Sequence, residues 1–215
     1  MQSKNQPYTL GLDIGIASVG WCVLGEEHIL DLGVRAFDKA ETAKEGDPLN
    51  LTRRMARLMR RRLFRRAWRL KKLTRLLKRH GVIENGKLFE PDRPAPISPW
   101  QLRVEGLNRL LNKEEWARVL YHLCKHRGFH WISRAEAKKA EEDKSEGGKV
   151  KQGLAATQRL MNKKGYRSAA EMVLAEFPTA QRNKQGQYDK ALARVLLGQE
   201  FALLFATQRR LGNPH

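Results

Sequence analysis

Acidic residues are absent from one long stretch of this 215-residue chain, between positions 48 and 83, where 14 residues are Lys or Arg. Residues 1–47 hold four basic and eight acidic residues, and residues 84–215 hold 24 and 15. The formal net charge of +19 is therefore concentrated in one segment. A segment with this charge density needs a polyanion to neutralise it, so it is not expected to be an ordinary solvent-exposed surface. Nucleic acid is the usual partner, and an anionic membrane surface is the alternative.

Cysteine and long apolar runs are scarce as well. Cys22 and Cys124 are the only cysteines and stand 102 positions apart, which excludes a disulfide framework and a zinc-binding spacing. No run approaches 18 apolar residues, and the opening MQSKNQPYTL lacks the features of a signal peptide. We therefore expect a soluble cytoplasmic protein with no membrane partner, whose 41% hydrophobic residues suffice for a core.

Neither glycine nor proline occurs between Leu51 and His80, and apolar residues recur there in helical steps of three and four. Thirty residues predict one helix about 45 Å long, which Gly81 ends. Phe64 and Trp68 lie four positions apart among the arginines, and we expect them to pack against the protein in preference to stacking on bases. The apolar stripe consists of Leu51, Met55, Met59, Leu63, Ala67, Leu70, Leu73 and Leu77.

Three short apolar runs separated by turns predict strands at Tyr8–Ile14, Ser18–Leu24 and His28–Arg35. These strands resemble the first hairpin and the third strand of an α/β sheet. Three strands rarely fold alone. Lys39–Asn50 is polar and is predicted to connect the sheet to the helix. Residues 84–99 contain four of the eight prolines and predict an extended linker.

Helical patterns resume after the linker, so residues 100–215 are predicted to be all-helical. The fold class is therefore mostly α, with a small β-strand segment and one long arginine-rich helix. Asn112 with Glu115 caps one helix, and Ser133 with Glu136 caps a charged helix that ends near Gly147. The other predictions are helices at Pro99–Leu111, Lys113–Arg127, Gly153–Asn162, Ser168–Phe177 and Asp189–Leu211, and a loop at Gln181–Tyr188.

Asp13 lies in the motif Gly-Leu-Asp-Ile-Gly at the end of the first predicted strand. A carboxylate within an apolar strand is costly unless it is paired or binds a metal, and the adjacent Gly15 suits a Mg²⁺ site. The simpler interpretation is an aspartate that caps a turn. Asp-x-Gly after a first strand occurs in RNase H-like nucleases and in actin-like ATPases. Ile16 and Ala17 stand where the ATPases need Thr or Ser and glycines, which weakens the ATPase hypothesis.

The arginines of the long helix include a series spaced by four, which follows one face slowly enough to track a phosphate backbone. Guanidinium groups suit phosphate oxygens better than ammonium groups do. We therefore predict a nucleic-acid-binding face, and the alternative is a solvated helix. The predicted contacts on this helix are Arg57, Arg61, Arg65 and Arg69, joined by Arg54 and Arg62.

Lys125-His126-Arg127-Gly128 stands at the end of a predicted helix, where basic residues also complement the helix dipole. His122, His126 and His130 are spaced by four, as metal ligands can be. However, Gly128 is expected to break the helix and no carboxylate stands nearby, so we do not predict a metal there.

The stretch Leu10–Val23, LGLDIGIASVGWCV, followed by the arginine-rich helix and then KHRG, resembles type II CRISPR RNA-guided DNA endonucleases, particularly the compact type II-C members. The resemblance implies an incomplete RNase H-like (RuvC) segment over residues 1–47 and an arginine-rich bridge helix over residues 48–83. A proline-rich linker over 84–99 and part of a helical recognition lobe over 100–215 would follow. The later RuvC-like segments and the HNH nuclease domain are expected beyond His215.

The same resemblance implies roles for individual residues. Asp13 is implied as a catalytic aspartate that binds Mg²⁺, and the bridge-helix arginines as contacts to the seed backbone of a guide RNA. Lys125 and Arg127 are implied as contacts of the recognition lobe to that RNA. The expected partners are guide RNA, either crRNA with tracrRNA or a single guide, and target DNA. An acidic anti-CRISPR inhibitor is a further expected partner for the basic helix.

The function predicted is thus the guide-RNA-binding region of an RNA-guided, Mg²⁺-dependent DNA endonuclease of prokaryotic antiviral defence. We expect no cleavage by this chain alone. Two alternatives remain at this stage. One is a non-enzymatic RNA- or DNA-binding protein in which Asp13 is structural, and the other is an actin-like, sugar-kinase-like ATPase with a basic insertion.

Overall fold

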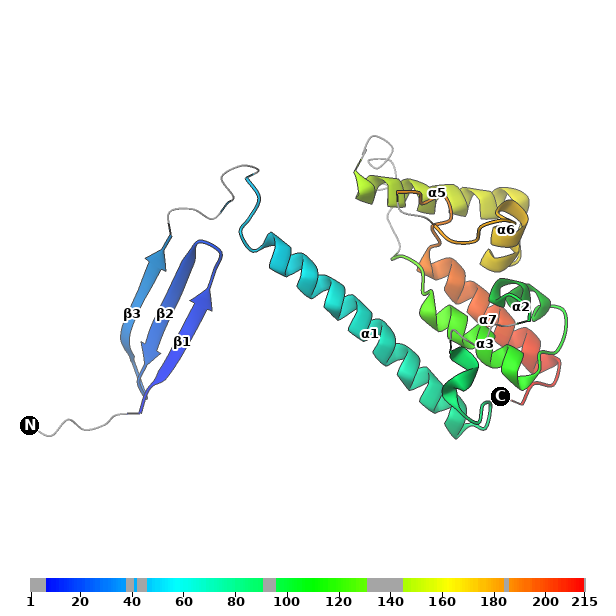
Figure 1. Cartoon of the computed structure of the whole chain (residues 1–215), viewed down its shortest axis with the longest axis horizontal. Coiled ribbons are helices and arrows are strands. Elements are labelled where there is room, and N and C mark those ends of the chain that lie inside the picture. Colours follow the sequence, from blue (N-terminus) through cyan, green and yellow to red (C-terminus); the bar gives the residue numbers. More distant parts are fainter. Residues whose placement is uncertain are drawn as a thin grey trace, which may run out of the picture. The chain divides into compact units, whose positions relative to one another are not determined.

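The computed structural model describes residues 7–37, 41, 46–90, 96–130, 145–183 and 186–214. It divides into two compact units, Met1–Arg65 and Arg66–His215, and the division falls inside the long helix α1 (Leu51–Arg79). Strands precede α1 and helices follow it (Figure 1). The fold class predicted from the sequence, mostly α with a small sheet, is confirmed.

The first unit contains an antiparallel sheet in the order β1-β2-β3, formed by Thr9–Ile14, Ser18–Leu24 and Ile29–Ala36. The first turn is closed by the amide of Gly15, which donates to the carbonyl of Ser18 at 2.8 Å. The three predicted strands are confirmed to within one residue at each end. Alternating apolar residues and glycine-containing turns are local signals, which is why the sequence suffices to locate them.

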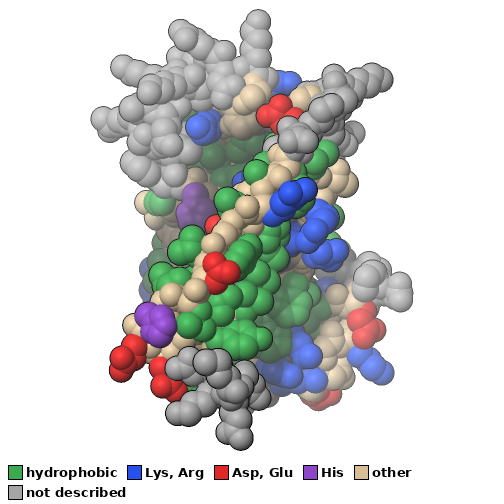
Figure 2. Space-filling view, turned by 90° about the vertical axis from the view of Figure 1, so that its left-hand side faces the viewer, with side chains coloured by type: hydrophobic (Ala, Val, Ile, Leu, Met, Phe, Trp, Pro, Cys, Tyr) green, Lys and Arg blue, Asp and Glu red, His purple; other side chains and the backbone are tan. Residues whose placement is uncertain are grey.

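Both faces of this sheet carry apolar side chains. Leu12 lies opposite Trp21 on one face, and Trp21 lies opposite Gly33. The Trp21 ring covers Gly33 so closely that a Cβ atom added to this glycine would come within 2.6 Å of the ring. Leu12 is 58% exposed, and Val34 on the other face is 70% exposed. Figure 2 shows hydrophobic side chains gathered over the strands. A sheet with two apolar faces is built to be an inner layer, because such faces are stable only when covered.

Helix α1 is exposed along most of its length. All residues from Thr52 to Trp68 are exposed, and burial begins only at Arg69 and reaches 4% exposure at Leu77. Gly81, with φ +63°, ends the helix as predicted. The predicted apolar stripe is therefore packed only over its last third, and Phe64 and Trp68, which were expected to pack against the protein, are exposed side chains. The exposed fractions are 59% for Met55, 55% for Met59, 56% for Leu63, 70% for Phe64 and 45% for Trp68.

The second unit is helical and has a single hydrophobic core. It contains the last turns of α1, α2 (Pro99–Glu105), α3 (Lys113–Lys125), α5 (Glu146–Lys164), α6 (Ala169–Glu176), α7 (Arg194–Arg210) and a short 3-10 helix at Gly86–Phe89. Leu102, Trp116, Met172 and Leu204 form its fully buried centre. The capping box predicted at Asn112 is confirmed: its side chain accepts from the Glu115 amide at 2.9 Å.

The helix predicted at Pro99–Leu111 is shorter, because α2 ends at Glu105. Gln208 of α7 explains the early end. Its buried side chain accepts from the Leu111 amide at 2.9 Å and donates to the carbonyls of Gly106 and Arg109 at 2.7 Å each. The turn from 106 to 111 thereby obtains hydrogen bonds that a helix would otherwise supply.

Two other helix ends differ from the predictions for a common reason. Helix α3 ends at Lys125 instead of Arg127, and α7 begins at Arg194 instead of Asp189. Between them, Phe129 donates to the Leu192 carbonyl at 2.9 Å and accepts from the Arg194 amide at 2.7 Å. This bridge holds both segments extended, and Gly128 with φ +71° turns the chain into it.

Helix α5 also corrects a prediction. The glycines at 147 and 148, expected to end a charged helix, lie in the first turn of α5, where Ser145 accepts from the Gly148 amide at 3.1 Å. The predicted cap at Ser133 and Glu136 lies outside the described residues. The predicted extended linker contains the 3-10 helix at Gly86–Phe89, and Leu88 within it is 4% exposed.

A buried ion pair joins α2 to α7. Arg103 donates from Nε to Oε1 of Glu200 at 2.6 Å and from Nη2 to Oε2 at 2.8 Å, with both side chains at most 1% exposed. Glu200 also accepts from the Ala170 amide at 3.0 Å, and Nη1 of Arg103 lies 3.2 Å from Nδ1 of His122. The pair thus links four helices, α2, α3, α6 and α7, through a satisfied network, which is the arrangement that a buried charge requires.

We expect Glu200→Gln to lower the free energy of unfolding of the helical unit by about 3–5 kcal/mol, because the charge of Arg103 would be left buried without a counter-charge. Chemical denaturation measures this change. Asp189→Asn is the matched control, since the Lys190–Asp189 pair is 3.3 Å apart with Asp189 54% exposed and is worth at most about 1 kcal/mol. Equal effects of the two substitutions would show that the buried pair is not the stabilising element.

Candidate nucleic-acid interface

The N-terminal two thirds of α1 present a dense positive surface. Eight arginines lie between Thr52 and Trp68, and all are exposed. The described residues include no ion pair to any of them. A straight helix of 29 residues is about 44 Å long, so the charges lie along a rod. Five of the six predicted contacts on α1 are exposed in this way: Arg54, Arg57, Arg61, Arg62 and Arg65.

Arg69, the sixth predicted contact, forms a hydrogen bond within the protein. Its Nε donates to the carbonyl of Cys124 at 2.9 Å, and the side chain is half-buried. Cys124 lies in the last turn of α3, where backbone carbonyls have no partner within the helix. Arg69 therefore joins the second half of α1 to α3 within the helical unit. The remaining donors of its guanidinium are still available for other contacts.

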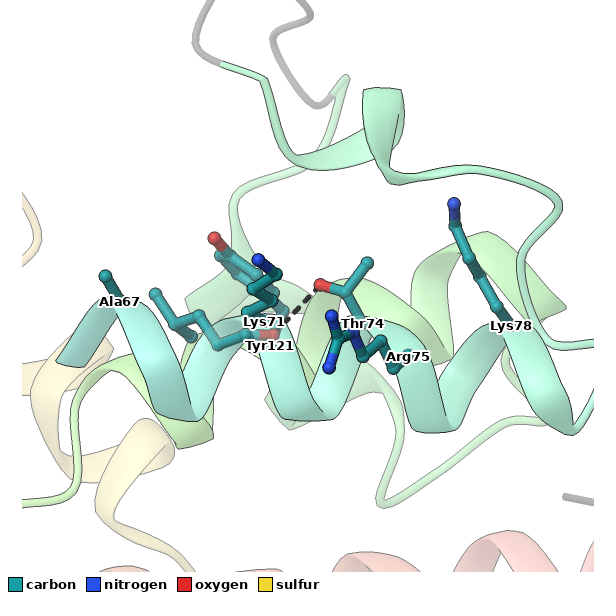
Figure 3. A pocket seen from close by; sticks show the side chains of 7 residues that line it. Ala67, Lys71, Thr74, Arg75, Lys78 and Tyr121 are labelled. Atoms are coloured by element: carbon teal, nitrogen blue, oxygen red, sulfur yellow. Dashed lines mark hydrogen bonds between the residues drawn. The ribbon is translucent and has the colours of Figure 1, made fainter. Parts of the chain in front are cut away.

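A groove of about 540 Å³ follows the second half of α1. Figure 3 shows Lys71 and Lys78 extending to the same side of the helix with Thr74 between them, and Tyr121 of α3 beside them. The Tyr121 ring stacks on Phe89, with centroids 4.0 Å apart and planes 8° from parallel. Burial raises the pKa of the Tyr121 hydroxyl.

Sequence reasoning did not single out these groove residues. Lys71 and Lys78 with Arg75 are spaced by three and four, so their common face was available as a signal. Tyr121 had no such signal, because only the packing of α3 on α1 brings it to the groove.

Lys125 and Arg127, the two predicted contacts outside α1, lie near the end of α3. Lys125 is half-buried, and burial is the main cause that lowers its pKa, followed by the positive charges of Arg66 and Arg182. Arg127 is exposed. Several cations therefore lie near this end of α3 without an ion pair to any described acidic residue, which favours an anionic ligand here as well as on α1.

Of the three histidines spaced by four, His122 and His126 lie together, with ring centroids 4.8 Å apart. Burial, and then the charge of Arg103, lowers the pKa of His122 to about 2. Nε2 of His130 lies 3.2 Å from Nη1 of Arg194. Burial, and then Arg182, lowers the pKa of His126 to about 4. In the described part of the chain no three His, Cys, Asp or Glu side chains gather to hold a metal ion.

Asp13 is exposed and lies opposite Gly20 in the sheet. A Cβ atom added to Gly20 would be 3.7 Å from the Cβ atom of Asp13. The neighbouring glycine leaves space beside the carboxylate. A hydrolytic Mg²⁺ centre needs several acids around the ions. Asp13 fits as one ligand, but the described residues do not fit a complete centre. The structure also has no helix, among those described, that is long and apolar enough to span a membrane.

Comparison with known proteins gives consistent results, although no protein-family model matches the chain. The CRISPR-associated endonuclease Cas9 of Campylobacter jejuni is 34% identical over 220 residues, which cover 94% of this chain and 21% of that protein. Cas9 of Staphylococcus aureus is 32% identical over 131 residues, covering 60% of this chain and 12% of that protein. The chain thus spans about one fifth of the length of the first relative.

Solved structures agree. Campylobacter jejuni Cas9 in complex with sgRNA and target DNA has a TM-score of 0.63 at 30% identity, covering 95% of this chain and 27% of that one. The St1Cas9-sgRNA-AcrIIA6-tDNA59-ntPAM complex has a TM-score of 0.54 at 25% identity, covering 96% and 24%.

The fold of this chain, with its three-stranded sheet, long helix and helical unit, therefore matches a segment of CRISPR-associated endonucleases. Within that class, the chain belongs to the Cas9 family and corresponds to one segment of its members. The resemblance identified from the sequence is confirmed.

Proposed function

We propose that the chain is the guide-RNA-binding region of an RNA-guided DNA endonuclease of bacterial antiviral defence. One observation carries the proposal: eight exposed arginines on α1 have no acidic partner within the described residues. Phosphate groups of RNA are the ligands that such a surface fits best, because each guanidinium can bind two phosphate oxygens. The related Campylobacter jejuni structure contains sgRNA and target DNA, which supports this choice of polyanion.

Individual residues of the long helix and of the helical unit would each contact the RNA backbone. Arg57, Arg61 and Arg65 would bind successive phosphates of the guide, with Arg54 and Arg62 beside them. Arg69 would combine its bond to Cys124 with a phosphate contact. Lys125 and Arg127 would bind the same RNA from the helical unit. Target DNA would be recognised by pairing with the bound guide.

Asp13 would contribute one ligand to a Mg²⁺ ion of the RuvC-like nuclease site. The ion, when bound, would stabilise charge on the phosphate during strand hydrolysis. The other acids of the site would come from segments that the relatives contain and this chain does not span. The role of this chain's own residues is to hold the Asp13 carboxylate at the end of β1, with Gly20 leaving it accessible.

The exposed face of α1 would also attract a protein that imitates RNA. An acidic inhibitor could neutralise the same arginines and exclude the guide, because both ligands need the same positive surface. The related St1Cas9 complex contains AcrIIA6, an anti-CRISPR protein. This supports an inhibitor as a partner class, and the acidic character is our inference from α1.

The test is binding of single-stranded RNA by the chain and by the double variant Arg61→Ala, Arg65→Ala. We expect the variant to bind more weakly at low salt, with the logarithmic salt slope reduced by about 0.7 to 1 for each lost phosphate contact. Arg209→Ala with Arg210→Ala is the matched control, because it removes the same charge from exposed positions at the end of α7. Equal losses from both variants would mean that only net charge matters and that α1 is not the site.

A further inference from the structure

The helical unit contains a second basic site, which α1 does not line. A cavity of about 390 Å³ opens between α2, the end of α3 and the segment that leads into α7. Pockets of this size hold small organic ligands, typically with an apolar floor and a few polar groups. Its polar lining includes His126, Gln181, Arg182, Asn183 and Lys190, and its apolar lining includes Trp100, Phe129, Leu192 and Leu197.

The charge of this cavity comes mainly from Arg182. Arg182 is exposed and has no ion pair among the described residues. Arg103 also lines the cavity, but Glu200 neutralises it. Lys190 lies 3.3 Å from the exposed Asp189 carboxylate, a weak pair that leaves much of its charge available. The cavity is therefore positive at one side and suits an anionic group.

His126 provides a polar atom without a partner. Its Nε2 is shielded from solvent, and no described group forms a hydrogen bond with it. Buried polar atoms are nearly always satisfied, so an unsatisfied nitrogen in a ring that lines the cavity favours a polar ligand beside that ring. Burial, and then the charges of Arg182, Lys125, Arg66 and Arg103, holds the pKa of His126 at about 4. The ring is therefore neutral at pH 7, and Nε2 can accept or donate according to the tautomer.

The apolar side of the cavity includes a ring on a rigid support. Phe129 is 41% exposed, and its backbone is fixed by the Leu192 carbonyl and the Arg194 amide. Asn183 is fixed as well, because its Oδ1 accepts from the Lys190 amide at 2.9 Å. A planar ligand could stack on Phe129 without ordering a flexible loop, which lowers the entropic cost of binding. An inorganic anion alone would leave this apolar side uncovered.

We propose that this cavity binds a single nucleotide of unpaired RNA, with its phosphate at Arg182, its base against Phe129 and the ring of His126 beside it. The inference rests on the proposed function only for the choice of RNA as the source of the nucleotide. It differs from backbone binding along α1 because it involves a base, so the site would hold one unpaired position in register relative to the helical unit.

Titration of the whole chain with adenosine 5′-monophosphate, followed by NMR of the histidine rings, tests the proposal. We expect saturable binding that shifts the His126 signals, with inorganic phosphate binding at least about tenfold more weakly because it leaves Phe129 uncovered. Arg182→Ala should weaken binding of the nucleotide about tenfold or more, the loss of one charge-assisted hydrogen bond. Arg210→Ala, an exposed charge remote in sequence, should leave it unchanged.

Absence of saturable binding, or binding that Arg182→Ala does not weaken, would overturn the proposal. Equal affinity for inorganic phosphate would also overturn it, since no base would then be held. Phe129→Leu should weaken nucleotide binding but not phosphate binding. Leucine is chosen because it keeps an apolar side chain at this position, whereas Phe129→Ala could prevent folding. If the chain binds RNA with a steep salt dependence but not the nucleotide, only this inference fails. If it binds no RNA, the proposed function fails.

Discussion

The affinity of the chain for single-stranded RNA is expected to fall about 10³- to 10⁵-fold when monovalent salt rises from about 50 to about 200 mM. The eight arginines between Thr52 and Trp68 are exposed along one helix, and each that binds a phosphate releases counterions from the RNA. About six to ten phosphate contacts give a loss of this size. A fluorescence anisotropy titration at several salt concentrations measures it.

The slope of affinity against salt concentration distinguishes electrostatic binding from other binding modes. Binding through stacking or through hydrogen bonds to bases releases few counterions and would give a shallow slope. A flat salt dependence with retained affinity would therefore contradict electrostatic binding by α1. Duplex DNA of equal length is a useful comparison, because a rod of positive charge that recognises only phosphates should bind it with a similarly steep slope.

Asp13→Ala is expected to abolish cutting of one DNA strand, by resemblance the non-target strand, in a full-length endonuclease that contains this segment. The carboxylate would be a metal ligand, and hydrolysis needs the ion that it helps to hold. Guide binding should be unchanged, because Asp13 lies on the sheet and not on α1. Separate assays of each strand, with RNA binding measured in parallel, distinguish these effects.

Asp31→Ala is the control for Asp13→Ala. Asp31 is another exposed aspartate of the same sheet, but it lies opposite Val23, whereas Asp13 lies opposite Gly20, so the two side chains are on different faces. The control should therefore keep both cutting activities. Double-strand cutting at the normal rate by the Asp13 variant would remove this residue from the nuclease site.

Much of the fold is encoded in local signals. Helix α1 begins at Leu51 and ends before Gly81 because thirty residues lack glycine and proline and a glycine with positive φ follows. The Asn112 cap is equally local, because the atoms that form it are three residues apart. Such features depend on neighbours in sequence, so a single sequence is enough to predict them.

The errors concern contacts between distant residues. Gln208 ends α2 early from almost 100 positions away, and the bridge at Phe129 shortens α3 and α7 together. No periodicity reveals either contact. The arginines of α1 were predictable from composition and spacing, whereas Tyr121 and Arg182 reach their sites only through packing of the helical unit. The apolar stripe of α1 was predictable from its spacing, whereas the extent of its burial, which is confined to the last turns, depends on the packing of the helical unit.

Hydrogen exchange of the chain with and without RNA, at one fixed salt concentration, tests the central claim most directly. Free α1 has repelling arginines and little packing before Arg69, so its amides should exchange quickly there and slowly around Leu77. Bound RNA favours the ordered helix and should slow exchange most between Arg57 and Arg69. Protection confined to residues 150–215, with exchange in the arginine segment unchanged, would show that RNA binds elsewhere and would contradict the account.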